Sequence, residues 1–169
     1  LEDLAFSDSD LEYLDSLGQF RPDFLDYLKD FRFRGDVYAV PEGSLVFPQE
    51  PLVRIHGTLI EAQVIESLLL NIVNFQCLIA TKTARVVHAS DYGKVLEFGL
   101  RRAQGVNGAL AASRASYIGG AGATSNTLAG KIYGIPVSGT MAHSWVMAFE
   151  SEVDAFDRYA DLYPDSTGL

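Results

Sequence analysis

The sequence predicts an α/β fold in which short strands alternate with helices along the second half of the chain. Short apolar runs occur at Val95–Phe98, within Ile118–Ala123 and at Ile135–Ser138, and each is followed by a polar loop and then a helical stretch. This alternation favours parallel strands joined by right-handed crossovers. Of the 169 residues, 48% are hydrophobic, which is typical of a globular chain and excludes general disorder.

The first part of the chain has a different pattern. Ser7 and Ser9 are expected helix caps, Gly18 an expected helix stop, and Pro22 an expected helix start. Prolines and glycines then separate short runs of β-forming residues, which is typical of a small antiparallel meander. The predicted elements are two helices, Ser7–Leu17 and Pro22–Phe31, and a meander over Asp36–His56 with strands at Val37–Val40, Leu45–Phe47 and Leu52–Ile55.

A long helix is predicted from Thr58 to Ala89. Its apolar arc is so wide that we expect it to be buried between two layers. The most apolar run, Ser67–Ala80, is interrupted by amide side chains and is shorter than the roughly 20 residues that span a bilayer. The single cysteine, Cys77, lies in this pattern, so we expect a buried, unreactive thiol and no disulfide framework.

Charge and composition exclude some classes of partner. With 22 acidic and 13 basic residues the net charge is -9, which disfavours binding to nucleic acid or to an anionic membrane surface. The sequence opens without a basic and apolar targeting segment, and we therefore expect a cytoplasmic protein. Domain organisation is predicted as residues 1–90, ending in the long connecting helix, and residues 91–169.

Three polar loops follow the three apolar runs of the second half. In a parallel sheet, the loops after the strands carry the chemistry, so these loops are expected to converge on one face. The helices between them are predicted at Ala109–Ile118, Thr127–Tyr133 and Trp145–Tyr163. The loops contain Arg101-Arg102, Thr124-Ser125-Asn126, and Thr140 to Ser144 with His143 among them.

Each of these residues has a structural interpretation beside a functional one. Guanidinium groups suit carboxylates and phosphates, but Arg101 and Arg102 are equally consistent with a solvated turn. Asn126 at a helix start is typical of a cap, and in a site it offers an amide donor and an acceptor. The position of His143 is consistent with four roles: a general base, a metal ligand, a phosphate acceptor or a structural loop residue. No second histidine or cysteine lies at ligand spacing, so no metal ligands are predicted.

The motifs together resemble those of a known family. Phe98-Gly99-Leu100-Arg101-Arg102-Ala103-Gln104-Gly105, Thr124-Ser125-Asn126-Thr127-Leu128-Ala129-Gly130 and Gly139-Thr140-Met141-Ala142-His143-Ser144 are similar to those of nicotinate phosphoribosyltransferases, as is Phe31–Thr81. The resemblance implies part of an α/β N-terminal domain, followed in residues 91–169 by the first half of an irregular (β/α) barrel of the type II phosphoribosyltransferase kind. Family members extend beyond both ends of this sequence, so the resemblance implies a fragment.

The resemblance also implies an activity. The family joins nicotinate to phosphoribosyl pyrophosphate, giving nicotinate mononucleotide and pyrophosphate in NAD biosynthesis and pyridine nucleotide salvage. This glycosyl transfer is coupled, as in a ligase, to ATP hydrolysis through a phosphorylated histidine. Mg²⁺ is the implied cofactor, and a homodimer the implied assembly. By matching motif, His143 is the phosphorylated residue, and the implied substrate-binding residues are Arg101, Arg102, Asn126, Thr140 and Ser144.

Two other functions remain open at this level. One is a related phosphoribosyltransferase acting on quinolinate or nicotinamide, against which Asn126 and the histidine loop argue. The resemblance implies that nicotinamide-using relatives have an aspartate at the position of Asn126. An aspartate there would repel a substrate carboxylate. The other is an inactive fragment that serves only in folding or assembly.

Overall fold

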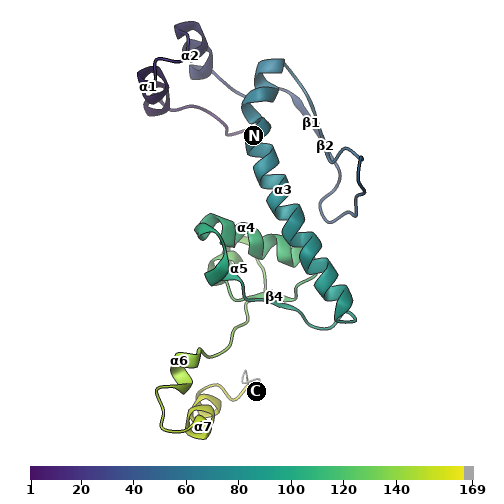
Figure 1. Ribbon diagram of the computed structural model, residues 1–169, viewed down its shortest axis with the longest axis vertical. Coiled ribbons are helices and arrows are strands. Elements are labelled where there is room, and N and C mark those ends of the chain that lie inside the picture. Colours follow the sequence, from purple (N-terminus) through teal and green to yellow (C-terminus); the bar gives the residue numbers. More distant parts are fainter. Residues whose placement is uncertain (166–169) are drawn as a thin grey trace. The chain divides into compact units, whose positions relative to one another are not determined.

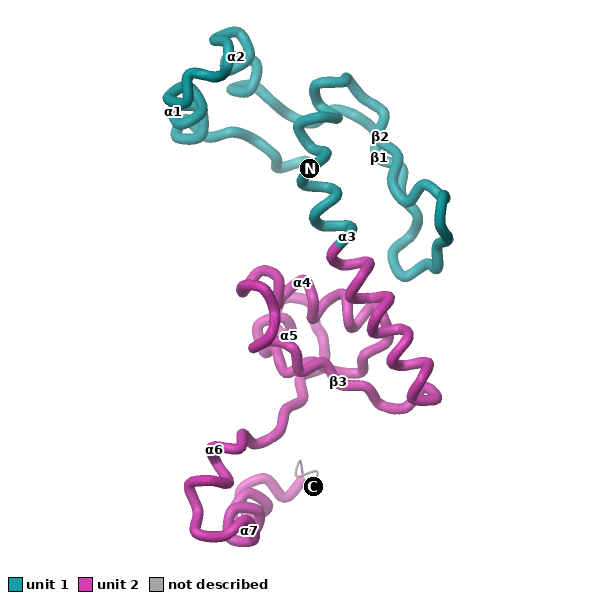
Figure 2. Tube along the Cα trace, viewed as in Figure 1, with its two compact units in different colours: residues 1–74 teal, residues 75–169 magenta. Residues whose placement is uncertain are grey.

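The protein, for which we use a computed structural model, folds as two compact units, Leu1–Asn74 and Phe75–Leu169 (Figure 2). Residues 1–165 are described here. The boundary between the units falls within one long helix (Figure 1). Because the units are defined by compactness alone, the predicted division into residues 1–90 and 91–169 stays a prediction.

The first unit begins with two short helices that pack on each other. Helix α1 spans Asp8–Ser16 and starts in a capping box in which the Ser7 and Asp10 side chains each accept a backbone N–H of the other residue. Helix α2 spans Pro22–Lys29 and has its proline in the first turn. Phe31 follows α2 and is fully buried, with edge-on contacts to the rings of Phe6 and Tyr27. Both predicted helices are confirmed.

A two-stranded antiparallel hairpin follows, not the predicted three-stranded meander. Strand β1, Asp36–Ala39, pairs directly with strand β2, Val53–His56. The run Leu45–Phe47 forms no strand, and Leu45 is 88% exposed in the connecting loop. Prolines at 41, 48 and 51 lack the N–H that a ladder needs. These prolines flank the run instead of interrupting it, and the N–H of Phe47 donates to Glu50 Oε2 at 3.0 Å within the loop.

Helix α3, Leu59–Ala89, confirms the long predicted helix, but its predicted burial is wrong. Glu61 and Ile65 are its buried residues, and Cys77 is exposed, because no other described element packs extensively along it. By length and composition α3 could cross a membrane: its most apolar 18-residue window has a mean hydropathy of 1.6, with 6% of that window buried. Core helices of soluble proteins meet the same length and composition criteria.

The second unit is built around a small parallel sheet, as predicted. Strand β3, Leu96–Glu97, pairs in parallel with strand β4, Ala123–Thr124. A parallel bridge from Thr124 to Val137 adds the third predicted strand as a single contact. The strands are shorter than the apolar runs that predicted them, but their parallel pairing agrees with the prediction.

Helices connect these strands. Helix α4, Gly105–Ile118, begins four residues before its predicted start. Helix α5, Thr127–Tyr133, has its predicted bounds and ends at Gly134, whose φ of 68° is the left-handed conformation that glycine favours. A single 3-10 turn, Leu100–Arg102, lies between β3 and α4.

The last predicted helix, Trp145–Tyr163, is divided in two. Helix α6 spans His143–Val146 and helix α7 spans Glu152–Leu162. Ser151 explains the division, because it is extended and its hydroxyl oxygen accepts the N–H of Asp154, which starts a new helix. The indole Nε1 of Trp145 donates to the Ala155 carbonyl at 3.1 Å and ties the two helices together.

Candidate functional site

The three polar loops of the second unit begin at the same edge of the small sheet. The N–H of Ser125 donates to the Glu97 carbonyl at 2.9 Å, and the N–H of Ser138 donates to the Thr124 carbonyl at 3.0 Å. Because the strands are parallel, their carboxyl ends point the same way. The 3-10 turn Leu100–Arg102, called the arginine turn below, therefore leaves the sheet beside the Asn126 loop and the loop that starts at Gly139.

Backbone hydrogen bonds hold the arginine turn in place, and the side chains of Arg101 and Arg102 are exposed. The N–H of Arg102 donates to the Gly99 carbonyl at 2.9 Å, which closes the 3-10 turn. Arg102 Nη2 lies 3.5 Å from the Phe98 carbonyl, a long contact. Neither Arg101 nor Arg102 takes part in the ion pairs found among residues 1–165, which are Arg21–Asp23 and His56–Asp36.

A pocket of about 430 Å³ lies under the arginine turn. Phe75, Ile79 and Leu100 give it apolar walls. Its charged lining residues are Lys82, Arg102 and the acidic Glu97. Neither Asn126 nor His143 is among the described residues that line this pocket. Of the three loops, the arginine turn is therefore the one that lines this pocket among the described residues.

Asn126 is buried at 4% exposure and is a helix cap. Its Oδ1 accepts the N–H of Ala129 at 3.2 Å, at the start of α5, and its own N–H donates to Thr124 Oγ1 at 3.0 Å. The structural interpretation of this residue is confirmed. With Oδ1 engaged in the cap, the side-chain NH₂ is the group left to donate to a ligand.

The loop that carries the histidine is exposed. Thr140, His143 and Ser144 all face solvent, and His143 is the first residue of α6. Within residues 1–165, no hydrogen bond or ion pair joins His143 to Arg101, Arg102 or Asn126. The structure thus brings the starts of the three loops together, and the meeting of their side chains in one site stays a prediction.

Glu97 is a site residue that the sequence did not reveal. Its Oε1 accepts the N–H of Gly99 at 2.5 Å, and its Oε2 accepts the hydroxyls of Thr124 at 2.6 Å and Ser113 at 3.0 Å. Thr124 and Ser113 lie 27 and 16 residues away, so no local pattern marks the carboxylate. The one available signal was an acidic residue inside a short apolar strand.

No ready-made metal site accompanies these residues. The described part of the chain holds no cluster of three or more histidine, cysteine, aspartate or glutamate side chains. Glu97, the acidic group nearest to the loops in sequence, already accepts three donors. Mg²⁺ is often bound by one or two carboxylates together with substrate phosphates, and these residues do not supply such ligands.

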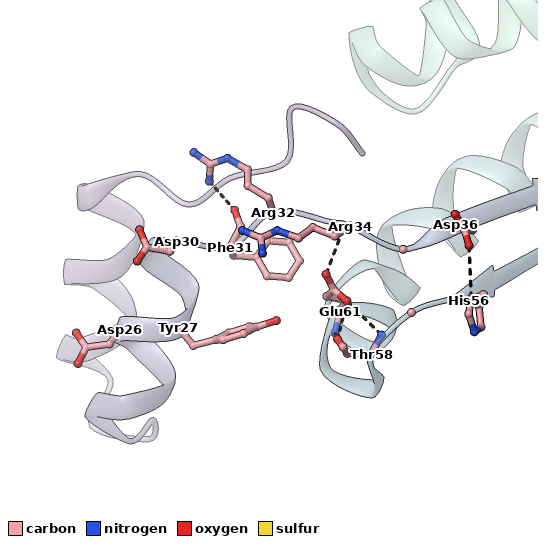
Figure 3. Close-up of a pocket in the computed structure, with 12 residues that line it drawn as sticks. Asp26, Tyr27, Asp30, Phe31, Arg32, Arg34, Asp36, His56, Thr58 and Glu61 are labelled. Atoms are coloured by element: carbon pink, nitrogen blue, oxygen red, sulfur yellow. Dashed lines mark hydrogen bonds and ion pairs between the residues drawn. The ribbon is translucent and has the colours of Figure 1, made fainter.

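A larger hollow, of about 860 Å³, lies in the first unit between α2, the hairpin and the start of α3 (Figure 3). Its charged lining comes from Asp26, Asp30, Arg32, Arg34, Asp36 and Glu61. Glu61 is buried, and hydrogen bonds from the Thr58 hydroxyl, then from the Thr58 and Arg34 N–H groups, lower the pKa of its carboxyl. None of the predicted site residues lines this hollow.

Comparisons with known proteins give one consistent result. Residues 1–74 match the family model of the nicotinate phosphoribosyltransferase (NAPRTase) N-terminal domain. The chain is 51% identical over 164 residues to a nicotinate phosphoribosyltransferase of Mycobacterium tuberculosis, covering 97% of this chain and 35% of that protein. It is 50% identical over 170 residues to the Bacillus subtilis enzyme of that name, covering 100% of this chain and 34% of the other.

The fold agrees with the same group. The structure is similar to that of human nicotinic acid phosphoribosyltransferase, with a TM-score of 0.77 and 42% identity over 85% of this chain and 30% of that one. The predicted fold class, part of an N-terminal α/β domain followed by the first half of a type II phosphoribosyltransferase barrel, is confirmed by this match. The chain spans about a third of the length of these relatives.

Proposed function

The chain belongs to the nicotinate phosphoribosyltransferase family, and we propose that the full-length polypeptide carrying it transfers phosphoribose from phosphoribosyl pyrophosphate to nicotinate. The products would be nicotinate mononucleotide and pyrophosphate. One observation carries the proposal: the three family-like motifs begin at the same edge of the small parallel sheet, at the ends of β3, of β4 and of the segment that bridges to β4 at Val137. Active sites in folds of this kind are built at that edge.

The arginine turn supplies positive charge for the leaving group. In this transfer the pyridine nitrogen bonds to the anomeric carbon while the bond from that carbon to pyrophosphate breaks, through a transition state with oxocarbenium character. Arg101 and Arg102 are exposed next to a pocket with Lys82, and cations placed there stabilise the growing charge on pyrophosphate.

Asn126 gives the preference for the acid. Its side-chain NH₂ donates to the nicotinate carboxylate, whereas an aspartate there would repel the same group. In this proposal Thr140 and Ser144 bind substrate through their exposed hydroxyls, and each hydroxyl is both donor and acceptor.

His143 is the proposed phosphate acceptor. Its exposure at the start of α6 leaves the imidazole open to ATP, the proposed co-substrate. An imidazole nitrogen bonds to the γ-phosphorus while the bond from that phosphorus to the β-phosphate oxygen breaks, and ADP leaves. A phosphoryl group there adds negative charge and acceptor oxygens, which reorganise contacts around the substrates. Mg²⁺ is the proposed cofactor and would travel with the phosphates of ATP and phosphoribosyl pyrophosphate, so no step is assigned to it here.

The proposed setting follows from the same family. We place the activity in NAD biosynthesis and pyridine nucleotide salvage, in the cytoplasm, with the net charge of -9 disfavouring nucleic acid as a partner. A homodimer is the proposed assembly, supported by apolar side chains that the chain leaves uncovered, such as Leu78 at 70% and Val137 at 52% exposure.

A substrate panel tests the proposal. The full-length polypeptide is incubated with phosphoribosyl pyrophosphate and Mg²⁺, together with nicotinate, nicotinamide or quinolinate, and the mononucleotides are separated by chromatography. We expect mononucleotide to form at a higher rate from nicotinate than from nicotinamide or quinolinate. Preference for nicotinamide or quinolinate would replace the proposal with a related transferase, and no product from any substrate would favour a folding or assembly role.

The histidine is tested separately by labelling with [γ-³²P]ATP. His143→Ala should remove the label and the ATP coupling while leaving a slow ATP-independent transfer. His88→Ala is the matched control, because His88 is exposed on α3 and belongs to none of the three loops. Retained stoichiometric coupling in His143→Ala would refute the phosphate-acceptor role.

A further inference from the structure

Two of the three loops are joined through a single carboxylate. Glu97 accepts the N–H of Gly99, the residue that opens the arginine turn, at Oε1. At Oε2 it accepts the hydroxyl of Thr124, whose oxygen in turn accepts the N–H of Asn126 at 3.0 Å. Each carboxylate oxygen thus holds one loop.

We propose that Glu97 is a positioning residue that sets the arginine turn and Asn126 at their working separation, a role that rests on the function proposed above. Glu97 also lines the pocket under the arginine turn, but both of its carboxylate oxygens accept hydrogen bonds from groups of the protein itself. Its effect passes through the backbone of Gly99 on one side and through Thr124 on the other. The two substrate-binding groups are then held by one rigid acceptor instead of by two independent loops.

The surroundings make this linkage stiff. Thr124 and Ser113 are both 1% exposed, and Ser113 on α4 donates a third hydrogen bond to the same carboxylate oxygen as Thr124. Glu97 itself is half-buried, and burial of its two hydroxyl partners shields these hydrogen bonds from water on that side. The carboxylate is therefore braced against α4 as well as against the two loops.

The chemistry of the acceptor decides which replacements succeed. A carboxylate offers acceptors on both oxygens, and the N–H of Gly99 can only donate. Gln at 97 keeps the length and one acceptor oxygen, which can still meet Gly99, while its NH₂ faces the Thr124 oxygen. Asp at 97 keeps the charge but is one methylene shorter, so it cannot reach both loops at once.

The proposal predicts a split between kinetic constants in the full-length polypeptide. Small displacements of binding groups cost up to about 100-fold in rate. We expect Glu97→Asp to raise the KM for nicotinate and to lower the nicotinate-to-nicotinamide ratio of kcat/KM by at least about tenfold. Glu97→Gln should lie between Glu97→Asp and wild type. The matched control is Glu66→Asp, an exposed glutamate on α3.

A purely structural role has a different signature. Loss of folded protein lowers kcat by reducing the active fraction, with KM and the substrate ratio unchanged. Thr124→Val, which removes the hydroxyl at nearly constant volume, should reproduce the KM and selectivity change of Glu97→Asp, and Thr124→Ser should restore wild-type values. An active enzyme with unchanged KM and selectivity in Glu97→Asp and Thr124→Val would overturn the proposal.

Backbone exchange separates this role from the proposed activity. In Glu97→Asp, hydrogen exchange measured by NMR should be faster at the amides of both Gly99 and Asn126. Exchange at amides in the interior of α4 should be unchanged. That result supports the linkage even if the wild-type enzyme makes no nicotinate mononucleotide, in which case the proposed function alone fails. Faster exchange at only one of the two amides, or at neither, would overturn the linkage.

Discussion

Asn126 combines a structural and a proposed chemical role in one side chain. Its oxygen caps α5, and its NH₂ is the remaining donor. Replacement by alanine would confound the two roles, because loss of a cap costs about 1 kcal/mol of stability. Aspartate keeps the capping acceptor and changes only the group that would face a carboxylate.

The substitution Asn126→Asp should therefore change selectivity without loss of fold. Two like charges at 4 Å repel by about 4 kcal/mol at an effective dielectric constant of 20, so we predict at least a roughly tenfold fall in the nicotinate-to-nicotinamide ratio of kcat/KM. Initial rates with both substrates measure it, and Asn107→Asp, exposed on α4, is the control. An unchanged ratio would contradict the role of Asn126.

Glu61 makes the first unit sensitive to acid. Its carboxyl accepts the Thr58 hydroxyl and the N–H groups of Thr58 and Arg34, so its pKa in the folded state is below the ordinary value of 4.5. A lowered folded-state pKa stabilises the fold above the ordinary value. That stabilisation is lost as the pH falls from about 4.5 through the folded-state pKa.

We predict that Glu61→Gln flattens this acid dependence. Urea unfolding between pH 3 and pH 7 should show wild type more stable than Glu61→Gln near neutrality, with the difference shrinking as the pH falls below about 4.5. Glu66→Gln, exposed on the same helix, should follow wild type throughout. A constant difference between wild type and Glu61→Gln at all pH values would show that the carboxylate is not responsible.

Local side-chain roles could be predicted from the sequence, and long-range ones could not. Ser7 and Asn126 were both predicted as caps, because a cap is set by residues three or four positions away. Glu97 and Glu61 find partners 27 residues along the chain, at Thr124 and Arg34. Those contacts depend on strand pairing and on the path of the hairpin, which short patterns do not encode.

At the level of elements, one glycine inside α4 and one at its C-cap separate packing from helix propensity. A Cβ on Gly119 would lie 2.5 Å from the Ala80 carbonyl oxygen and 2.9 Å from Thr83 Cβ, both on the second-unit part of α3. A Cβ on Gly108 would meet nothing within 4 Å. The same substitution at the two positions therefore tests whether α3 and α4 are in close contact.

Gly119→Ala should destabilise the chain, and Gly108→Ala should stabilise it. Overpacking of this kind costs about 1–3 kcal/mol, and alanine for glycine inside a helix contributes about 1 kcal/mol. Thermal unfolding of both variants measures the difference. Equal shifts in the unfolding temperature would mean that Gly119 does not lie close against Ala80 and Thr83 of α3.

Most elements followed in type and chain order from residue patterns, and α5 also followed in its extent. The parallel strands and α5 were predicted correctly because apolar runs and capping residues mark them locally. The predictions of a strand at Leu45–Phe47 and of one helix over Trp145–Tyr163 were wrong. Flanking prolines in the first case and the Ser151 cap in the second outweighed the apolar pattern. In both cases backbone hydrogen bonding decided the outcome against side-chain composition.

At the scale of the whole molecule, α3 carries more apolar surface than this chain covers. Its wide apolar arc predicted a helix buried between two layers, yet Leu59, Leu70 and Leu78 are 76%, 52% and 70% exposed. The sequence predicted burial because periodicity reports which faces are apolar. It does not report whether other parts of the same chain lie against those faces.

The central claim is that the arginine turn, the Asn126 loop and the His143 loop form one substrate site. Hydrogen exchange with mass spectrometry on the full-length polypeptide tests this most directly, without and with nicotinate and phosphoribosyl pyrophosphate. We predict that ligand slows exchange in Phe98–Gly105, Thr124–Gly130 and Gly139–Ser144 together, while the loop 40–52 in the hairpin stays unchanged. Protection of a single segment, or of none, would contradict the claim.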